Sequence, residues 1–258
     1  MIWRLLVTGM ERMDMGRKSK RKMERQKAKE EKMVLSESSS FLMKEDYAAL
    51  RTNVAFSLPG EGGKCIVVTS SIQHEGKSTT ALNLAASYAQ VGKKVLLIDC
   101  DMRMPVIASR LHIKEDEEKK TGLSHLLIGE CKESDAVRYV EKLDIYMITA
   151  GMIPADPTRL LSSSEMTILL DKMKKEYDVV VLDCPPVNIV VDACLLAGCV
   201  DGYLMVVQHG KSEKRAIASM ISQIKRVNGN ILGFVYTNAP VEDKKYGGYQ
   251  YGYGYGRK

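Results

Sequence analysis

A short polar segment between an apolar run and a helical pattern constrains this fold more than any other part of the sequence. The run Cys65–Thr69 is followed by Ser70-Ser71-Ile-Gln-His-Glu-Gly-Lys-Ser-Thr-Thr, and apolar residues then recur at three- and four-residue spacing over Lys77–Gln90. A strand, a loop with Gly-Lys-Ser and a helix N-terminus, in this order, are the context of a phosphate-binding loop. The segment therefore predicts that phosphate groups bind at one edge of a β-sheet.

The residues of this loop have distinct expected roles. Gly76 lets the backbone approach the phosphates, Lys77 reaches the β- and γ-oxygens of a nucleotide, and Ser78 can coordinate Mg²⁺. Ser71 stands where a glycine is usual, and serine tolerates a tight turn less well. Gly-Lys-Ser alone also occurs by chance at helix starts. The predicted nucleotide-binding residues of the loop are Gln73, His74, Glu75, Gly76, Lys77, Ser78 and Thr79.

Three aspartates at the ends of apolar runs predict a metal site beside the loop. Asp99 and Asp101 end the second run, and Asp183 ends a later one. Mg²⁺ binds through one or two carboxylates and phosphate oxygens, so we assign Ser78, Asp101 and Asp183 to the metal, directly or through water. Asp99 is a candidate general base for an attacking hydroxyl, with metal-bound water as the alternative partner. A lone aspartate at a strand end can instead cap the next turn.

Two further polar residues are candidates for the same site. Arg103 can stabilise the charge of a transferring phosphoryl group or form a structural ion pair, and the sequence favours neither role. Asn238 follows the last apolar run, where an amide can donate to and accept from adenine. It can equally be a turn residue before Pro240. The predicted catalytic residues are Lys77, Asp99, Asp101 and Arg103.

The spacing of the other apolar runs predicts the fold class. Runs of strand length alternate with helical patterns, which indicates an α/β, P-loop NTPase-like fold with a predominantly parallel sheet and helices on both faces. The predicted strands are Cys65–Thr69, Val95–Ile98, Asp144–Thr149, Val179–Leu182, Tyr203–Val207 and Ile231–Tyr236. The predicted helices are Glu45–Phe56, Lys77–Gln90, Ser164–Lys175 and Glu213–Arg226.

Composition divides the chain into a basic arm (1–43), a P-loop domain (44–241) and a tail (242–258), with flexible segments at both ends. Between Glu11 and Lys32, ten Lys or Arg face five Asp or Glu, so most of the net charge of +6 is in the arm and no nucleic-acid partner is expected. The arm is either a solvated segment or exposed helix, or one attracted to the anionic inner leaflet of a membrane or to the cytoplasmic segment of a membrane partner. No run of about 18 apolar residues occurs, which predicts a cytoplasmic protein. The six cysteines lack metal-ligand spacing and are expected to be buried thiols.

The C-terminal tail is polar, glycine-rich and without periodicity, so we expect it to be flexible. Its tyrosines are then exposed aromatic side chains that can accept a phosphoryl group. The alternative is a low-complexity end that merely associates. The predicted phosphoacceptors are Tyr246, Tyr249, Tyr251, Tyr253 and Tyr255.

Four blocks together resemble the bacterial tyrosine kinases that control capsule and exopolysaccharide production. They are the loop Glu75-Gly-Lys-Ser-Thr, the strand end Asp99-x-Asp-x-Arg, the run ending in Asp183-Cys-Pro-Pro, and the tyrosine cluster, and the resemblance covers roughly residues 44–258. It implies ATP and Mg²⁺ as cofactors, autophosphorylation in trans within a ring of subunits, and further protein tyrosine substrates. It also implies activation by a transmembrane regulator of polysaccharide chain length, which would bring the chain to the inner face of the membrane.

One departure from the family concerns the ring. The family's oligomerisation motif is Glu-x-x-Arg-x-x-Arg, and Glu45–Arg51 matches it except that Ala48 replaces the middle arginine. We therefore expect a less stable ring.

Two other functions are compatible with such a fold. The main alternative is a Par- or Min-type ATPase that dimerises around ATP. Those relatives carry a second lysine five residues before the phosphate-loop lysine, and Ile72 occupies this position here. A small-molecule ATP-dependent ligase or kinase is the other.

Overall fold

A computed structural model describes residues 33–113 and 121–240. Most of the predicted basic arm, the segment 114–120 and the chain from residue 241 lie outside the described residues. The five predicted acceptor tyrosines belong to this last segment.

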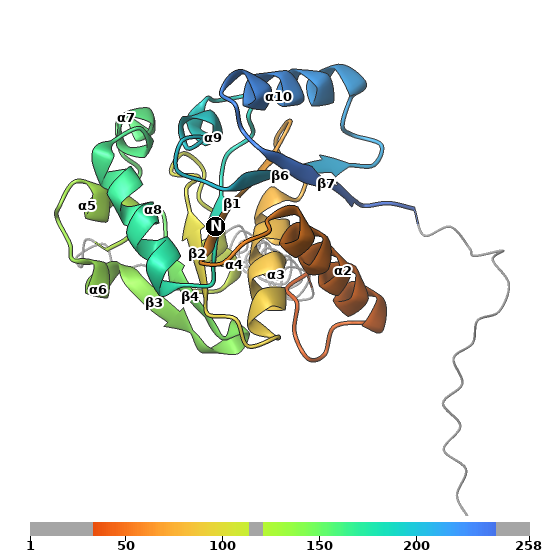
Figure 1. The fold of residues 1–258 in the computed structure, drawn as a ribbon, viewed down its shortest axis with the longest axis horizontal. Coiled ribbons are helices and arrows are strands. Elements are labelled where there is room, and N and C mark those ends of the chain that lie inside the picture. Colours follow the sequence, from red (N-terminus) through yellow and green to blue (C-terminus); the bar gives the residue numbers. More distant parts are fainter. Residues whose placement is uncertain (1–32, 114–120, 241–258) are drawn as a thin grey trace, which may run out of the picture.

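One mixed sheet of seven strands runs through the described part of the chain (Figure 1). Its strands are β1 (Lys64–Ser70), β2 (Val95–Asp99), β3 (Val137–Val140), β4 (Ile145–Ile148), β5 (Val179–Asp183), β6 (Gly202–Gln208) and β7 (Ile231–Thr237). Their spatial order is β3-β4-β2-β5-β1-β6-β7. All neighbouring pairs are parallel except β3 and β4. The predicted α/β fold with a predominantly parallel sheet is therefore confirmed.

The central strands are continuous apolar runs because helices cover both of their faces. Every residue of β2 and β5 is buried. The edge strand β3 was not predicted, since it is short and carries the polar Arg138 between valine and tyrosine. It pairs antiparallel with β4 through a tight connection in which Asp144 adopts a left-handed backbone, with φ at 53°.

Four long helices cover the sheet. Helices α2 (Phe41–Ser57) and α3 (Lys77–Ala89) pack on one face, and α8 (Ser164–Glu176) and α10 (Lys214–Arg226) pack on the other. All four were predicted. The short helices α4 (Ile107–Arg110), α5 (Leu123–Leu127), α6 (Glu133–Ala136), α7 (Pro157–Leu161) and α9 (Asp192–Leu195) were not, because four or five residues are too few to show a helical period.

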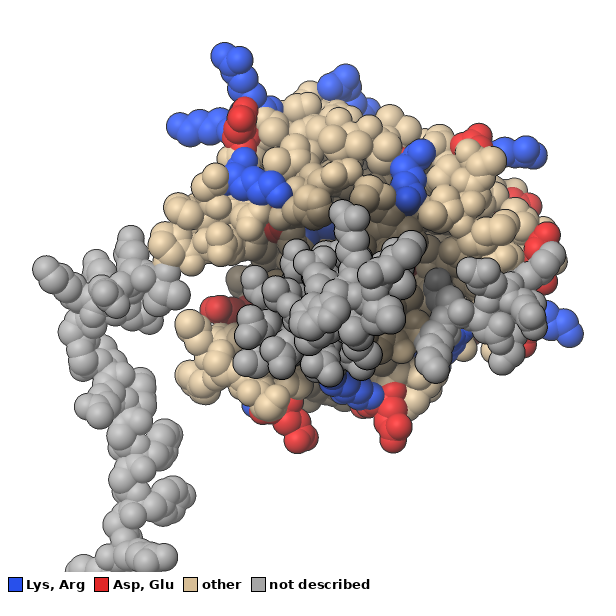
Figure 2. All heavy atoms as spheres, turned by 180° about the vertical axis from the view of Figure 1, so that it is seen from behind, with Lys and Arg blue, Asp and Glu red and all other residues tan. Residues whose placement is uncertain are grey.

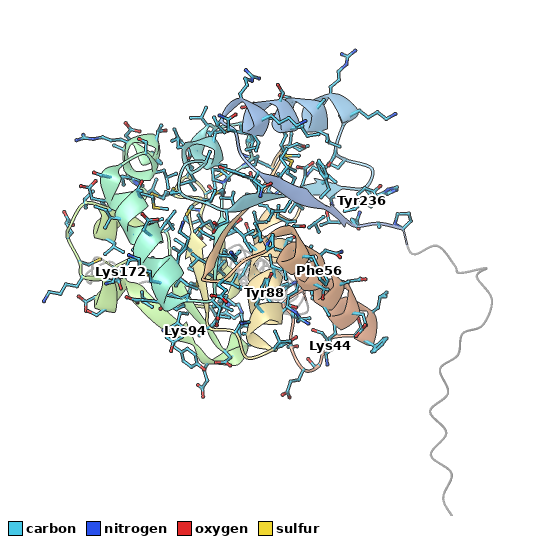
Figure 3. All side chains as sticks on the ribbon, viewed as in Figure 1. Lys44, Phe56, Tyr88, Lys94, Lys172 and Tyr236 are labelled. Atoms are coloured by element: carbon cyan, nitrogen blue, oxygen red, sulfur yellow. The ribbon has the colours of Figure 1, made fainter. Side chains whose placement is uncertain are left out.

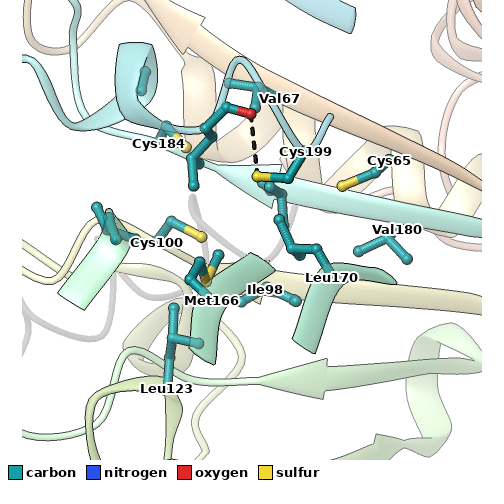
Figure 4. Packing of buried hydrophobic residues seen from close by; sticks show 14 of the residues in the cluster. Cys65, Val67, Ile98, Cys100, Leu123, Met166, Leu170, Val180, Cys184 and Cys199 are labelled. Carbon is teal, nitrogen blue, oxygen red and sulfur yellow. Dashed lines mark hydrogen bonds between the residues drawn. The ribbon is translucent and has the colours of Figure 1, made fainter. Parts of the chain in front are cut away.

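The cysteines belong mainly to the core between the sheet and α8. Figure 4 shows four of them among buried aliphatic side chains: Cys65, Cys100, Cys184 and Cys199. All six cysteines are free thiols, and Cys131 and Cys194 are only partly buried. The prediction of buried thiols is thus confirmed for four of the six.

The packed region begins before residue 44. Val34 and Leu35 are buried, and the Leu35 N–H donates to Asn83 Oδ1 of α3 at 2.8 Å. Helix α2 is attached to α3 in the same way, because Arg51 Nη1 donates to the Ser87 carbonyl at 2.7 Å. The hydroxyl of Tyr88, which lies beside α2 in Figure 3, donates to the Arg51 carbonyl. Residues from 34 onward therefore belong to the folded unit.

Charged side chains of both signs occur on the surface. Figure 2 shows basic side chains along the upper edge of the rear face and acidic ones mainly along its right and lower edges. On α10, which lies at the top of the molecule, the exposed basic residues are Lys214, Arg215, Lys225 and Arg226. Among the described helices, none has the length and apolar character needed to span a bilayer.

Candidate active site

The loop between β1 and α3 is shaped to hold an anion. Gly76 precedes the helix with φ at 98°, a left-handed conformation that favours glycine. A Cβ at Gly76 would also lie 3.4 Å from Thr237 Cγ2. No side chain caps the N-terminus of α3, so within the described structure its first N–H groups remain available for phosphate oxygens.

The buried carboxylate of Glu75 holds this loop together by accepting hydrogen bonds from its backbone. Glu75 Oε2 accepts hydrogen bonds from the N–H groups of Ser71 at 2.7 Å and Ile72 at 2.9 Å. The Ser71 hydroxyl donates to Oε1 at 2.9 Å, and the Ser212 hydroxyl donates there too. Ser71 does not have a left-handed backbone, so no glycine is needed at this position. The Glu75 side chain thus shapes the loop, while only its backbone can face a phosphate.

The lysine and the predicted metal carboxylates lie at one point. Lys77 Nζ is 2.8 Å from Asp101 Oδ2, 3.6 Å from Asp183 Oδ1 and 3.1 Å from Ser78 Oγ. The sheet makes this possible, because β2 and β5 are neighbours and Asp99 is the register partner of Asp183. The structure therefore brings these predicted residues together at the carboxyl edge of the sheet.

Burial and charge shift the pKa values of these groups. Burial lowers the pKa of Lys77, but the charges of Asp183 and Asp101 outweigh it and raise that pKa above its ordinary value. Burial raises the pKa of Asp99 well above its ordinary value, and the charge of Asp183 adds to the rise. Burial also raises the pKa of Asp183, against the opposing charge of Lys77. Burial is therefore the main reason that Asp99 and Asp183 hold their protons more strongly than an ordinary aspartate does.

The free oxygens of the aspartates fit a hydrated cation. Among the described residues, both carboxylate oxygens of Asp183 and Oδ2 of Asp99 are buried without a hydrogen-bond partner. Over the same residues, no three His, Cys, Asp or Glu side chains form a self-contained metal site. Mg²⁺ does not need such a cage, because it keeps several waters and uses phosphate oxygens as ligands. Asp183, Asp101 and Ser78 are thus suitable to hold Mg²⁺ together with a nucleotide.

Asp99 lies behind this group. It is fully buried, and its Oδ1 accepts a hydrogen bond from the Asp101 N–H at 3.1 Å. Asp101 lines the cavity of the site, whereas Asp99 is absent from the lining. Asp99 therefore orients the turn that carries Asp101.

Arg103 forms the ion pair that was one of its two predicted roles. Its Nε and Nη2 atoms contact the two carboxylate oxygens of Asp192 at 2.8 and 3.0 Å. Nη2 also lies 3.0 Å from Thr158 Oγ1. Asp192 is fully buried, so this bidentate pair joins the end of β2 to α7 and α9. Sequence reasoning missed Asp192, which has no motif around it.

A cavity opens over the phosphate loop. Of the predicted residues, Gln73, His74, Gly76, Lys77, Ser78, Asp101 and Arg103 line it. The lining also contains residues without a sequence signal, namely Met104, Val106, Arg110, Ile189 and Val190, and the Pro185-Pro186 pair that follows Asp183. Its walls are therefore the phosphate loop, the end of β2, α4 and the segment after β5.

Three predicted nucleotide-binding residues are outside this lining, namely Glu75, whose side chain points into the loop, Thr79 and Asn238. Thr79 lies in the first turn of α3, where its hydroxyl accepts a hydrogen bond from Arg110. Asn238 is exposed beyond the end of β7, in a left-handed conformation with φ at 52°. Its neighbour Thr237 donates through Oγ1 to the Glu75 carbonyl at 2.7 Å. Asn238 is therefore next to the phosphate loop, and its contact with adenine stays a prediction.

Residues 63–233 match the family described as AAA domain. The chain is 35% identical to the tyrosine-protein kinase YwqD of Bacillus subtilis over 217 residues, which are 84% of this chain and 88% of the relative. It is 34% identical to the tyrosine-protein kinase CpsD of Streptococcus pneumoniae over 203 residues, or 79% of this chain and 87% of the relative.

Solved structures agree with these relatives. The kinase domain of the Escherichia coli tyrosine kinase ETK is similar with a TM-score of 0.71 and 28% identity, over 81% of this chain and 80% of that chain. The chimerical protein CapA2B2 has the same TM-score with 33% identity, over 76% of this chain and 84% of that one. A Mycobacterium smegmatis cobyrinic acid a,c-diamide synthase with bound ATP analog and magnesium, at 20% identity, shares the fold with a TM-score of 0.57 over 67% of this chain and 74% of that one.

Proposed function

Because this chain belongs to the family of bacterial tyrosine kinases, we propose that it transfers the γ-phosphoryl group of ATP to protein tyrosines, including those of its own C-terminal tail. The observation that carries the proposal is the contact of Lys77 with Asp101 and Asp183 at the uncapped start of α3. This arrangement has N–H groups and a cation for the phosphates and free carboxylate oxygens for a metal.

The residues of the site have separate tasks in this reaction. The loop N–H groups and the helix start bind the phosphates, and Lys77 contacts the β- and γ-oxygens once a nucleotide separates it from the carboxylates. Mg²⁺ held by Ser78, Asp101 and Asp183 would neutralise charge on the phosphates. Burial of the cluster strengthens each of these electrostatic contacts, because little water screens them.

The position of Asp99 bears on its two predicted roles. A tyrosine hydroxyl with a pKa of about 10 benefits from proton removal or from a nearby metal. Asp99 is fully buried and, like Asp183, is absent from the lining of the cavity, whereas Asp101 lines it. This position supports contact with metal-bound water over direct proton removal. Asp101, which lines the cavity, is the better placed carboxylate to face an incoming hydroxyl.

We further propose that the chain acts with partners, as the family resemblance implies. A transmembrane regulator of polysaccharide chain length would activate it at the inner face of the membrane, and subunits would phosphorylate each other's tails. The surface of helix α2 supports this proposal, because Phe41, Leu42 and Phe56 are exposed there and could pack against a partner. The ring motif itself is weakened, since Ala48 replaces an arginine and Arg51 is bonded to α3 within the chain.

Autophosphorylation tests this function directly. The full chain, with and without the cytoplasmic segments of a candidate activator, is incubated with labelled ATP and Mg²⁺ and blotted for phosphotyrosine. We expect label on the activated wild type and none on Lys77→Met or on a chain truncated after Asp243. An activated wild type that turns over ATP but stays unlabelled would show that the kinase proposal is wrong.

A further inference from the structure

The cations that line the cavity differ in how they are paired. Lys77 contacts Asp101 and Asp183, and Arg103 is held by both oxygens of Asp192. Arg110 also lines the cavity, but no ion pair joins it to a carboxylate of residues 33–113 or 121–240. A guanidinium group has five N–H donors, and the hydroxyl of Thr79 engages only Nη1. Within these residues, Arg110 is therefore the cavity cation with donors to spare.

The fold holds Arg110 against the phosphate-binding turn. It is the last residue of α4, a helix anchored by the buried side chains of Ile107 and Ala108. Its Nη1 donates to Thr79 Oγ1 at 2.5 Å, across 31 residues of sequence. Thr79 belongs to the first turn of α3, whose N–H groups are not capped by a side chain of the described residues and can bind phosphate oxygens. The guanidinium is thus fixed where an anion is expected to bind.

We propose that Arg110 binds the phosphate oxygens that ATP and ADP have in common. This inference rests on the proposed function, because it takes the cavity to be the nucleotide site. Lys77 and Ser78 come first in the helix and face the transferred group and its metal, whereas Arg110 is attached one residue further along, at Thr79. The planar guanidinium can bind two phosphate oxygens at once, which a lysine cannot do.

The charge of Arg110 reaches the site even without a ligand. Burial raises the pKa of Asp183, and the positive charges of Lys77 and Arg110 both act against that rise. A role confined to joining α4 to α3 would need only the hydrogen bond to Thr79, not the charge. The two roles therefore differ in how binding responds to charge and salt.

Calorimetric titration of the full chain with Mg²⁺-ADP and with a non-hydrolysable Mg²⁺-ATP analogue tests this role. We expect Arg110→Gln to weaken both nucleotides by the same factor, about tenfold or more, because it removes a charge-assisted contact. Arg110→Lys should retain part of the affinity. The matched control is Arg226→Gln, an exposed arginine in the last turn of α10 that is not among the cavity-lining residues and should bind like the wild type.

The salt dependence of nucleotide binding distinguishes an effect of the Arg110 charge from a purely structural effect of the side chain. The affinity of the wild type should fall more steeply with NaCl concentration than that of Arg110→Gln, while the melting temperatures of the two remain similar. Unchanged affinity in Arg110→Gln, or weakening for the ATP analogue alone, would overturn the inference while leaving the proposed function standing. If Arg110→Gln melts early, Arg110→Lys decides the question, because it keeps the charge. An affinity between those of the wild type and Arg110→Gln, with the salt slope of the wild type, would support the inference, and wild-type affinity in both Arg110 variants would overturn it. A wild type that binds neither nucleotide would overturn the proposed function as well.

Discussion

Lys77 and Asp101 form a contact of 2.8 Å between Nζ and Oδ2 in a site nearly closed to solvent, with side chains 11% and 6% exposed. The contact joins the first residue of α3 to the turn after β2. Asp183 at the end of β5 is 3.6 Å from the same nitrogen. The ammonium group of Lys77 thus joins the start of one helix to the ends of two strands. Substitutions in this cluster should therefore alter both activity and stability.

Lys77→Met should abolish tyrosine labelling and also destabilise the fold at neutral pH. The substitution leaves Asp101 and Asp183 in a buried site without their cation, and breaking such a group typically costs about 3 kcal/mol or more. Urea denaturation at pH 7 measures this loss. The loss should shrink at lower pH, as the carboxylates protonate. Retained labelling would exclude Lys77 from the mechanism.

Asp99→Asn should make the protein more stable at neutral pH while reducing kinase activity. Burial and the charge of Asp183 raise the pKa of Asp99, so the folded state holds a proton that the unfolded chain has released. Stability therefore falls as the pH rises from the ordinary aspartate range through the raised pKa. Asparagine carries no charge and its Oδ1 can still accept from the Asp101 N–H.

The expected gain from Asp99→Asn is about 1 kcal/mol at pH 7, in the range of other substitutions that relieve strain at a functional site. It should disappear at a pH below the ordinary aspartate range, where Asp99 is protonated in both states. Denaturant midpoints of wild type and variant across a pH series measure it. A gain that is the same at every pH would contradict the electrostatic explanation.

The sequence predicted those parts of the site that belong to short, continuous motifs. The phosphate loop and the aspartates at strand ends are short segments whose positions follow from strand order, so Lys77, Asp101 and Asp183 could be expected to meet. Contacts across long stretches of chain had no such signal. Arg110 reaches Thr79 over 31 residues and Arg103 reaches Asp192 over 89, and only the packed fold brings them together.

The phosphate-loop motif does not predict in which direction its side chains point. Glu75 belongs to the phosphate loop in sequence, yet its carboxylate binds the loop from inside because the N–H groups of Ser71 and Ile72 point to it. The fold class was easier to predict, since β2 and β5 are uninterrupted apolar runs. Edge strand β3 was missed because a strand with one uncovered side and four residues has no such run.

Arg103→Lys and Asp192→Asn together test whether Arg103 acts on the substrate or only through its ion pair. If the pair is purely structural, both variants should lower stability and labelling to a similar extent, and the double variant should add little. If Arg103 also stabilises the transferring group, Arg103→Lys should reduce kcat well beyond the effect of Asp192→Asn. Single-turnover labelling with melting temperatures measured in parallel distinguishes the two outcomes.

Glu75→Ala should disrupt the phosphate loop, while Glu75→Gln should be much milder. Alanine leaves the buried N–H groups of Ser71 and Ile72 without an acceptor, at a cost of about 1 to 3 kcal/mol for each group. Glutamine keeps one oxygen for these two donors, and its amide can donate to the hydroxyls of Ser71 and Ser212. We expect ADP affinity and unfolding free energy to fall together in the alanine variant. Equal effects of both substitutions would indicate that the charge of Glu75, rather than its hydrogen bonds, matters.

Replacement of the five tail tyrosines by phenylalanine should end autophosphorylation and leave ADP binding unchanged. The reason is chemical, since phenylalanine keeps the ring but lacks the hydroxyl that accepts the phosphoryl group. Phosphopeptide mapping of the activated chain identifies the phosphorylated tyrosines, with Tyr236→Phe as the control. Tyr236 is 56% exposed on β7 and could accept a phosphoryl group in place of the tail, whereas Tyr47 is partly buried against α3 and is less accessible. Label that persists at wild-type level without the tail tyrosines, and disappears with Tyr236→Phe, would move the acceptor from the tail to the sheet edge.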